Sequence, residues 1–288
     1  MKSTRKFYWI FIFLCGLSLT KVYASAGKGD SLFFRGEFRD AALEYDRQFF
    51  MASDAFTGAK ALLGKAECYK QMENFVAAKT CLTSITLSNI PDSLLAQIRY
   101  QLALNSYLAG DFGMAESEII LLEVIESPEI PASKILLLKS LTYNELNKYK
   151  QAHDAVLEYI SNASVSEISR DSLRREVETL YRSKRLPHLK SPKRATILSI
   201  FLPGLGQTYA GYPGEGIISL SLNVAALGIL VFGAVNAYYI SGYVVGAGFL
   251  QNFYNGGQKR AAILANKHNY RVTREFNDSI HHFLMSIR

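Results

Sequence analysis

Small and apolar residues recur along the first part of the chain with a period of 37 residues. Each repeat has an aromatic residue, a small residue nine positions before it, an alanine three positions after it and a large apolar residue seven positions after it. In that order the columns are Phe38, Phe75, Phe112 and Tyr149; Gly29, Ala66, Ala103 and Ser140; Ala41, Ala78, Ala115 and Ala152; and Tyr45, Leu82, Ile119 and Val156. Spacings of three and seven residues are typical of helices. The pattern predicts four helical hairpins in series.

The columns also predict how the helices pack. The small residue allows two helices to approach closely, the aromatic residue fills the far end of the hairpin, and the alanine faces the partner helix. Pro91, Pro128 and Pro131 fall between hairpins, where they mark helix ends. We therefore expect a helical repeat domain over residues 25–182, with a closing helix over Ile168–Tyr181.

The predicted turns resemble those of the tetratricopeptide repeat family. Gly36-Glu37-Phe38, Gly110-Asp111-Phe112 and Tyr107 match its turn region. The resemblance covers about residues 26–165. It departs from the family in its period, 37 residues rather than about 34, and in Glu73 and Asn147, which occupy the positions of the turn glycine.

This resemblance implies an all-α, tetratricopeptide-like solenoid whose concave face is lined by the first helix of each hairpin. Such faces bind a peptide or a protein. Most aromatic residues of these helices are expected to be packing residues. The candidate groove residues are polar and lie on or near first helices: Gln97, Arg99, Gln101, Asn105 and Asn144.

A long segment near the C-terminus is almost without charge. Between Arg194 and Lys259 lie 64 residues, of which only Glu215 is charged, and the last 42 of them carry no charge. As helix those 42 residues would extend about 63 Å, roughly twice the thickness of a bilayer core. We expect a transmembrane helical hairpin with spans near Ile217–Asn236 and Tyr239–Gln258, connected at 236–242. A buried hairpin of a soluble protein is the alternative.

Small and polar residues are expected to hold the two spans together. Gly242 and Gly246 form a G-x-x-x-G that allows close packing, either on the first span or on a second copy of the chain. The polar residues of the spans are uncharged and are expected to form hydrogen bonds between helices: Asn223, Asn236, Gln251 and Asn252. With no acid or base inside the spans, a proton-coupled transporter has nothing to titrate.

A glycine-rich motif precedes the spans. It contains Pro203, Gly204, Gly206, Gln207, Tyr209 and Gly211. These residues interrupt an apolar stretch of 18 residues from Ala195, so a short helix is expected there rather than a full span. The motif resembles the P-G-x-G-Q-x-Y-x-G pattern of small two-helix bacterial membrane modules, similar to TM2-type domains, and 255–269 resembles their exit helix. The resemblance implies an architecture and no activity. A phosphate loop is excluded, because no G-K-[ST] follows.

The N-terminus has the pattern of a secretory signal peptide over residues 1–24. Met1–Lys6 is basic, Phe7–Leu19 is an apolar run of 13 residues, and small residues at 22–24 or 24–26 offer a cleavage site. The run is shorter than the roughly 20 residues that cross a bilayer, so an uncleaved anchor is the weaker alternative. Cys15 lies inside the run after Leu14, which does not suit lipid attachment.

The net charge of +7 is distributed unevenly along the chain. Residues 1–24 carry +4, residues 25–182 carry −5 and residues 183–288 carry +8. The basic residues flank the most apolar segments, which fits anionic lipid headgroups better than nucleic acid. Residues 259–288 alternate charged and apolar positions, which predicts an amphipathic helix after the membrane module of residues 183–258.

The distribution of basic residues and the signal peptide predict opposite membrane topologies. A cleaved signal and two spans would place the strongest basic flanks outside, against the positive-inside tendency. Either the stretch from Ala195 crosses the membrane, or charge is overridden. Because the signal features are strong, we expect a bacterial inner-membrane protein whose repeat domain is exported to the periplasmic side.

The remaining candidate chemistry is sparse. Cys68 and Cys81 lie on opposite helices of one predicted hairpin, so two packed thiols and a disulfide both stay open. His268, His281 and His282 have no acid or cysteine cluster beside them, so we expect no metal. No cofactor motif, nucleophile with a base or carboxylate pair emerges, and no enzymatic activity is expected.

The sequence leaves two functional hypotheses. The first is a membrane-anchored scaffold whose repeats mediate protein-protein interaction at the cell envelope. In the second, the C-terminal hairpin is the active part of an insertion, lipid-binding or channel-like module, and the repeats regulate it.

Overall fold

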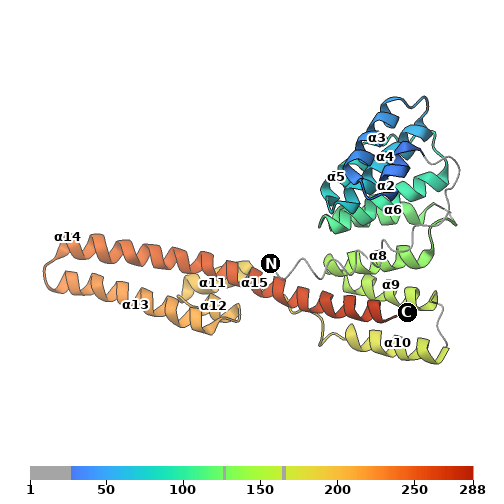
Figure 1. The fold of residues 1–288 in the computed structure, drawn as a ribbon. Coiled ribbons are helices and arrows are strands. Elements are labelled where there is room, and N and C mark those ends of the chain that lie inside the picture. Colours follow the sequence, from blue (N-terminus) through green and yellow to red (C-terminus); the bar gives the residue numbers. More distant parts are fainter. Residues whose placement is uncertain (1–26, 126–127, 164–166, 288) are drawn as a thin grey trace. The chain divides into compact units, whose positions relative to one another are not determined.

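The computed structural model describes residues 27–125, 128–163 and 167–287, apart from the side chains of 241–243, and these residues are all-α (Figure 1). No strand occurs among them. The predicted signal peptide lies outside the described residues. The chain divides into two compact units, which meet between Thr179 and Leu180.

The N-terminal unit consists of four consecutive helix pairs and a final helix in the part of the chain that the structure describes. The pairs are α2 (Lys28–Phe34) with α3 (Phe38–Phe50), α4 (Ala55–Gln71) with α5 (Phe75–Thr83), α6 (Asp92–Leu108) with α7 (Phe112–Glu123), and α8 (Ala132–Glu145) with α9 (Tyr149–Ser161). From α2 to α9 each helix packs against the next, and each first helix also touches the first helix of the following pair. The final helix, α10 (Glu167–Leu180), lies within one residue at either end of the helix predicted over Ile168–Tyr181.

The turn inside each pair has the same backbone conformation, and this explains the period. Gly36, Glu73, Gly110 and Asn147 all have positive φ, between 58° and 80°. At each turn the next residue donates its N–H to a carbonyl five positions earlier, at 2.8 to 3.0 Å. This bond and the left-handed residue before it define a Schellman motif, which ends a helix. Glu73 and Asn147 therefore take the part of the turn glycine, as the period predicts.

Burial follows the predicted columns. The alanines at 41, 78, 115 and 152 have no exposed surface, and the small and large apolar columns are also buried. The aromatic column is only half-buried. Two of its members pack against a ring on the preceding helix, Phe38 against Phe33 with ring centroids 5.3 Å apart and Phe112 against Tyr107 at 5.5 Å.

The two described cysteines are free and belong to different apolar clusters. Cys68 packs with Leu32, Ala41, Ala42 and Tyr45, whereas Cys81 packs with Leu62, Ile98 and their neighbours. Burial raises the pKa of the Cys68 thiol to about 12 and that of Cys81 to about 11. Because the two side chains point into separate clusters, the structure holds two packed thiols and no disulfide between them.

The C-terminal unit contains short helices followed by two long ones. They are α11 (Pro192–Phe201), α12 (Leu205–Tyr209), α13 (Pro213–Val235), α14 (Tyr239–Gly242), a π-helical segment η1 (Tyr243–Ala247) and α15 (Gly248–Ser286). The expected interruption after Ala195 is confirmed, since α11 ends at Phe201. The α13 and α15 helices contact each other, and α13 also packs along η1.

Two sequence-based boundaries in this unit were wrong. The non-helical connection after α13 is shorter than predicted, 236–238 before α14, and Ala237 takes a positive φ of 61° there. The second predicted span and the amphipathic helix after it are not separate, because α15 runs for 39 residues through Gln258 and Lys259. No proline stands at the change from uncharged to charged sequence, and the helix continues through Gly256 and Gly257.

Among the described helices, α13 is long and apolar enough to cross a membrane. Its most apolar 18-residue window has a mean hydropathy of 2.2, and only 17% of that window is buried inside the protein. A core helix of a soluble protein would be mostly buried. The exposed apolar surface of α13 is therefore evidence for membrane association.

Candidate functional site

The five candidate groove residues differ in accessibility. Gln97 is exposed on α6 and donates to Glu129 at 2.6 Å. Arg99 instead pairs with Glu118 of α7 at 2.8 Å, and both side chains are largely buried. Arg99 therefore faces the second helix of its own pair and is not a groove cation.

The two asparagines are structural. Asn105 and Asn144 are buried, and their amides donate to main-chain carbonyls one turn earlier, Gln101 at 2.7 Å and Ser140 at 2.9 Å. Gln101 is half-buried and accepts a hydrogen bond from Lys70. Of the five residues, Gln97 remains the one with an exposed side chain.

Lys70 is a buried cation that the sequence analysis missed. Only 1% of its side chain is exposed; its ammonium group lies 2.6 Å from a carboxylate oxygen of Glu67 and 3.1 Å from Gln101 of the next first helix. Lys70 occupies the same repeat position as Phe33, Tyr107 and Asn144, which are 37 residues apart. The other members of this repeat position could have indicated that Lys70 is buried. A paired charge at this depth links α4 to α6 and is closed to ligands.

One polar column of the first helices is accessible. Lys60, Gln97 and Lys134 stand 37 residues apart; the first two are exposed and Lys134 is half-buried. Neither lysine has an ion pair in the described part of the chain, although the Lys60 ammonium lies 5.1 Å from the Phe56 ring centroid. We call these three residues the first-helix column.

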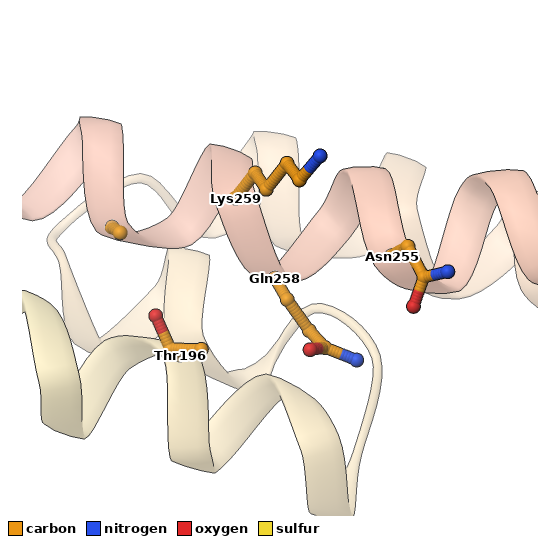
Figure 2. Close-up of a pocket in the computed structure, with 5 residues that line it drawn as sticks. Thr196, Asn255, Gln258 and Lys259 are labelled. Carbon is orange, nitrogen blue, oxygen red and sulfur yellow. The ribbon is translucent and has the colours of Figure 1, made fainter.

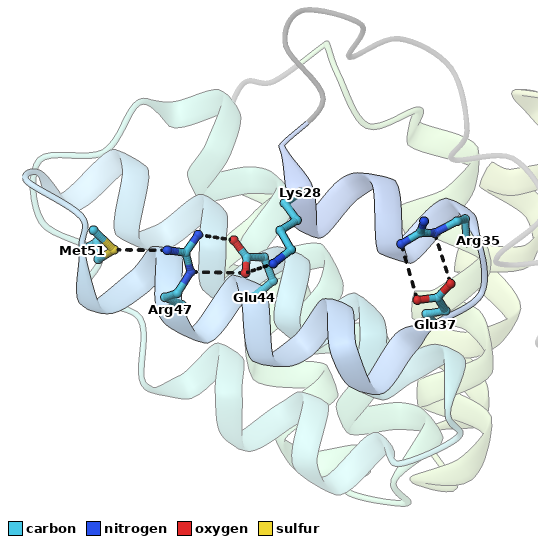
Figure 3. Close-up of polar contacts among 6 residues, drawn as sticks. All are labelled: Lys28, Arg35, Glu37, Glu44, Arg47 and Met51. Atoms are coloured by element: carbon cyan, nitrogen blue, oxygen red, sulfur yellow. Dashed lines mark hydrogen bonds and ion pairs between the residues drawn. The ribbon is translucent and has the colours of Figure 1, made fainter.

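Three ion pairs lie within the first helix pair (Figure 3). Glu44 pairs with Arg47 at 2.6 Å and with Lys28 at 3.8 Å, and Arg35 pairs with Glu37 at 3.1 Å. Ion pairs with a partly exposed partner contribute little to stability. They form a solvated surface.

The glycine-rich motif of the C-terminal unit is a helix-packing device. Gly204 has φ +95°, and a Cβ there would clash with the main-chain oxygen of Gly216 in α13. A Cβ on Gly206 would clash with the carbonyl oxygen of Ala195 in α11. Gly211 also has a positive φ, +94°. The glycines thus let the short α12 lie directly against α11 and α13.

Polar residues of the motif connect the helices around α12. Gln207 is buried, accepts from the Ser199 hydroxyl at 3.1 Å and donates to the Gly257 carbonyl at 3.0 Å. The Tyr209 hydroxyl accepts from the Ser191 N–H at 3.1 Å. One buried side chain therefore links α11, α12 and α15, and Pro203, half-buried in the turn before α12, completes the motif.

Further contacts fix the ends of the two long helices. Arg260 of α15 donates two hydrogen bonds to Glu215 of α13, at 2.7 and 2.8 Å. A Cβ on Gly246 would lie 2.7 Å from the main-chain nitrogen of Leu230, so this glycine of the G-x-x-x-G allows close approach to α13. Gly242 ends α14, in the stretch whose side chains are not described.

A polar pocket opens between α11 and α15. It has a volume of about 340 Å³ and is lined by Thr196, Asn255, Gln258, Lys259 and Ala262. Figure 2 shows Gln258 and Thr196 on facing sides, with Asn255 one turn away along α15. The lining holds two amides and an ammonium group and no carboxylate, and the Thr196 hydroxyl already donates to the Pro192 carbonyl at 3.1 Å. These groups suit an anion.

The histidines do not form a metal site in the described ranges. No group of three or more His, Cys, Asp or Glu residues there could hold a metal ion. His268 is half-buried on α15, and its pKa is lowered by burial and by nearby Lys190.

No protein-family model, curated protein sequence or solved structure matches this chain. Its function is therefore argued from its own residues.

Proposed function

We propose that this chain is a membrane-anchored helical-repeat scaffold that mediates protein-protein interaction at the bacterial cell envelope. The four helix pairs would form a tetratricopeptide-like solenoid that takes a protein partner. The hairpin of α13 with η1 and the start of α15 would span the membrane, and the predicted signal peptide would export the repeats to the periplasmic side.

The observation that carries the proposal is the equivalence of the four turns. Left-handed residues at 36, 73, 110 and 147, each followed five positions later by a fully buried alanine, make the pairs interchangeable units. Stacked units of this kind present equivalent side chains of successive first helices along one surface. The first-helix column, with its two unpaired lysines, is such a row.

Two features of the C-terminal unit support the anchor. The apolar surface of α13 is largely uncovered, and the glycine and glutamine contacts hold α11, α12, α13 and α15 together beside a small apolar cluster of Ala195, Ala210, Ala261, Leu264 and Ala265. A helix of this composition is stable with its surface in lipid, whereas the same exposed surface in water favours aggregation.

Position-specific photocrosslinking in cells that express the full-length chain tests the scaffold. We expect a photoreactive residue at Lys60 or Gln97 to capture the same partner protein, because both positions lie on the first-helix column. Val76 and Lys150 are matched controls, since both are exposed on second helices. Equal capture at the control positions, or none at Lys60 and Gln97, would contradict the proposal.

The second hypothesis, in which the hairpin is the active part, is favoured by one observation, the polar pocket between α11 and α15. Replacing residues 192–258 by an unrelated membrane anchor distinguishes the two. Function retained after the exchange supports the scaffold, and function lost supports an active hairpin.

A further inference from the structure

The pocket between α11 and α15 contains hydrogen-bond donors with no partner in the described structure. Lys259 has no ion pair there, and the side-chain amides of Asn255 and Gln258 have no hydrogen bond. Three other polar side chains of this unit are already engaged: Arg260 with Glu215, Lys190 with the Tyr209 carbonyl at 2.6 Å, and Gln207 with Gly257. The pocket is thus a local concentration of free donors.

Additional positive charge lies beside the pocket. Lys193 precedes Thr196 by one helical turn on the same side of α11. Arg194 is the next residue after Lys193. Both side chains are exposed and neither has an ion pair among the residues that the structure describes. The nearest acid to Arg194 in sequence within this unit, Glu215, pairs with Arg260. An anion in the pocket would therefore meet uncompensated positive charge.

The side chains beside the pocket change from basic to apolar along α11, toward its C-terminal end. The α11 and α15 helices are antiparallel, because Lys190 pairs with Asn269 whereas the Ile200 carbonyl accepts from the Tyr254 hydroxyl. Along α11 the order is Lys193, Thr196, Ile200. Beyond the pocket lie exposed apolar side chains, Ile197, Ile200 and the largely uncovered Phe201.

We propose that this pocket binds the phosphate of an anionic phospholipid, whose acyl chains lie along the exposed apolar side chains of α11. This inference rests on the proposed insertion of the α13 hairpin into a membrane. The donors match the phosphate oxygens, and the polar-to-apolar order matches an amphiphile that lies with its headgroup at the base of the hairpin. A free phosphate ion would use the donors but would leave the apolar side chains uncovered.

Lipid binding to the full-length chain in a non-ionic detergent tests the site. Native mass spectrometry would compare dioleoyl phosphatidylglycerol with dioleoyl phosphatidylcholine on wild type, Lys259→Gln, Asn255→Ala and Arg271→Gln. Arg271 is the matched control, because it is an exposed cation of α15 that does not line the pocket. We expect phosphatidylglycerol to bind about fivefold more weakly to Lys259→Gln and less than about twofold more weakly to Arg271→Gln.

Four results would overturn the lipid site: wild-type affinity in both pocket variants, an equal loss in Arg271→Gln, equal binding of the two lipids, or displacement of phosphatidylglycerol by an excess of inorganic phosphate. The last would assign the pocket to free phosphate. Failure of the site and failure of the anchor are distinguishable. If the chain still resists extraction from membranes but does not discriminate between the two lipids, the lipid site is refuted and the membrane anchor is not.

Discussion

Two residues at the turns of the N-terminal unit have a strained backbone conformation. Glu73 and Asn147 hold the left-handed conformation that Gly36 and Gly110 adopt at the equivalent turns. For residues other than glycine this conformation costs about 1–2 kcal/mol, although asparagine tolerates it better. The Asn147 side chain also accepts from the Tyr149 hydroxyl at 2.7 Å, whereas Glu73 forms no side-chain hydrogen bond in the described structure. Glu73 is thus the more strained of the two.

The substitution Glu73→Gly should stabilise the N-terminal unit. Relief of the left-handed strain outweighs the added entropy of an unfolded glycine, so the free energy of unfolding should rise by about 0.5–1 kcal/mol. Urea unfolding of residues 25–182, followed by far-ultraviolet circular dichroism, measures it. The reciprocal change Gly110→Ala is the control and should lower stability by about 1 kcal/mol. A loss of stability in Glu73→Gly would show that the turns are not equivalent.

At this scale the sequence predicts positions better than it predicts contacts. The period identified the buried alanines, and it identified Glu73 and Asn147 as glycine substitutes. It did not reveal that Arg99 turns toward Glu118, nor that Lys70 is buried. Those outcomes depend on which partner a long side chain reaches across a helix interface, and a column of residue types does not contain that information.

The short helix α12 shows what the glycine-rich motif does at the level of elements. Gly204 and Gly206 bring its backbone against α13 and α11, and Gln207 uses the contact to reach α15. The sequence predicted the break in the apolar stretch and the apolar helix α13. It did not predict that α15 would continue through Gly256 and Gly257, because tertiary contacts decide whether a glycine pair ends a helix.

Gly206→Ala should therefore destabilise the C-terminal unit. The new methyl group would clash with the Ala195 carbonyl, and the forced separation of α11 and α12 should cost about 1–3 kcal/mol. A lower midpoint of thermal unfolding, followed by circular dichroism of the full-length chain in detergent, would report this. Gly214→Ala is the matched control, because a Cβ at Gly214 has no atom within 4 Å. Equal midpoints for the two variants would refute the packing role of Gly206.

At the scale of the whole molecule, two units with different surfaces share one chain. The N-terminal unit buries its apolar columns and is acidic by sequence, whereas the C-terminal unit exposes an apolar helix between basic flanks. This division was predictable, because hydropathy and charge differ between the halves. The membrane topology was not predictable, since the signal peptide and the distribution of basic residues predict opposite orientations of the chain.

The most direct test of the account is whether the full-length chain is an integral membrane protein. Membranes from cells that express it would be washed with alkaline carbonate, and the chain in pellet and supernatant would be measured. The account predicts that the full-length chain stays in the pellet and that a chain lacking residues 213–258 is released. A full-length chain released into the supernatant would contradict it.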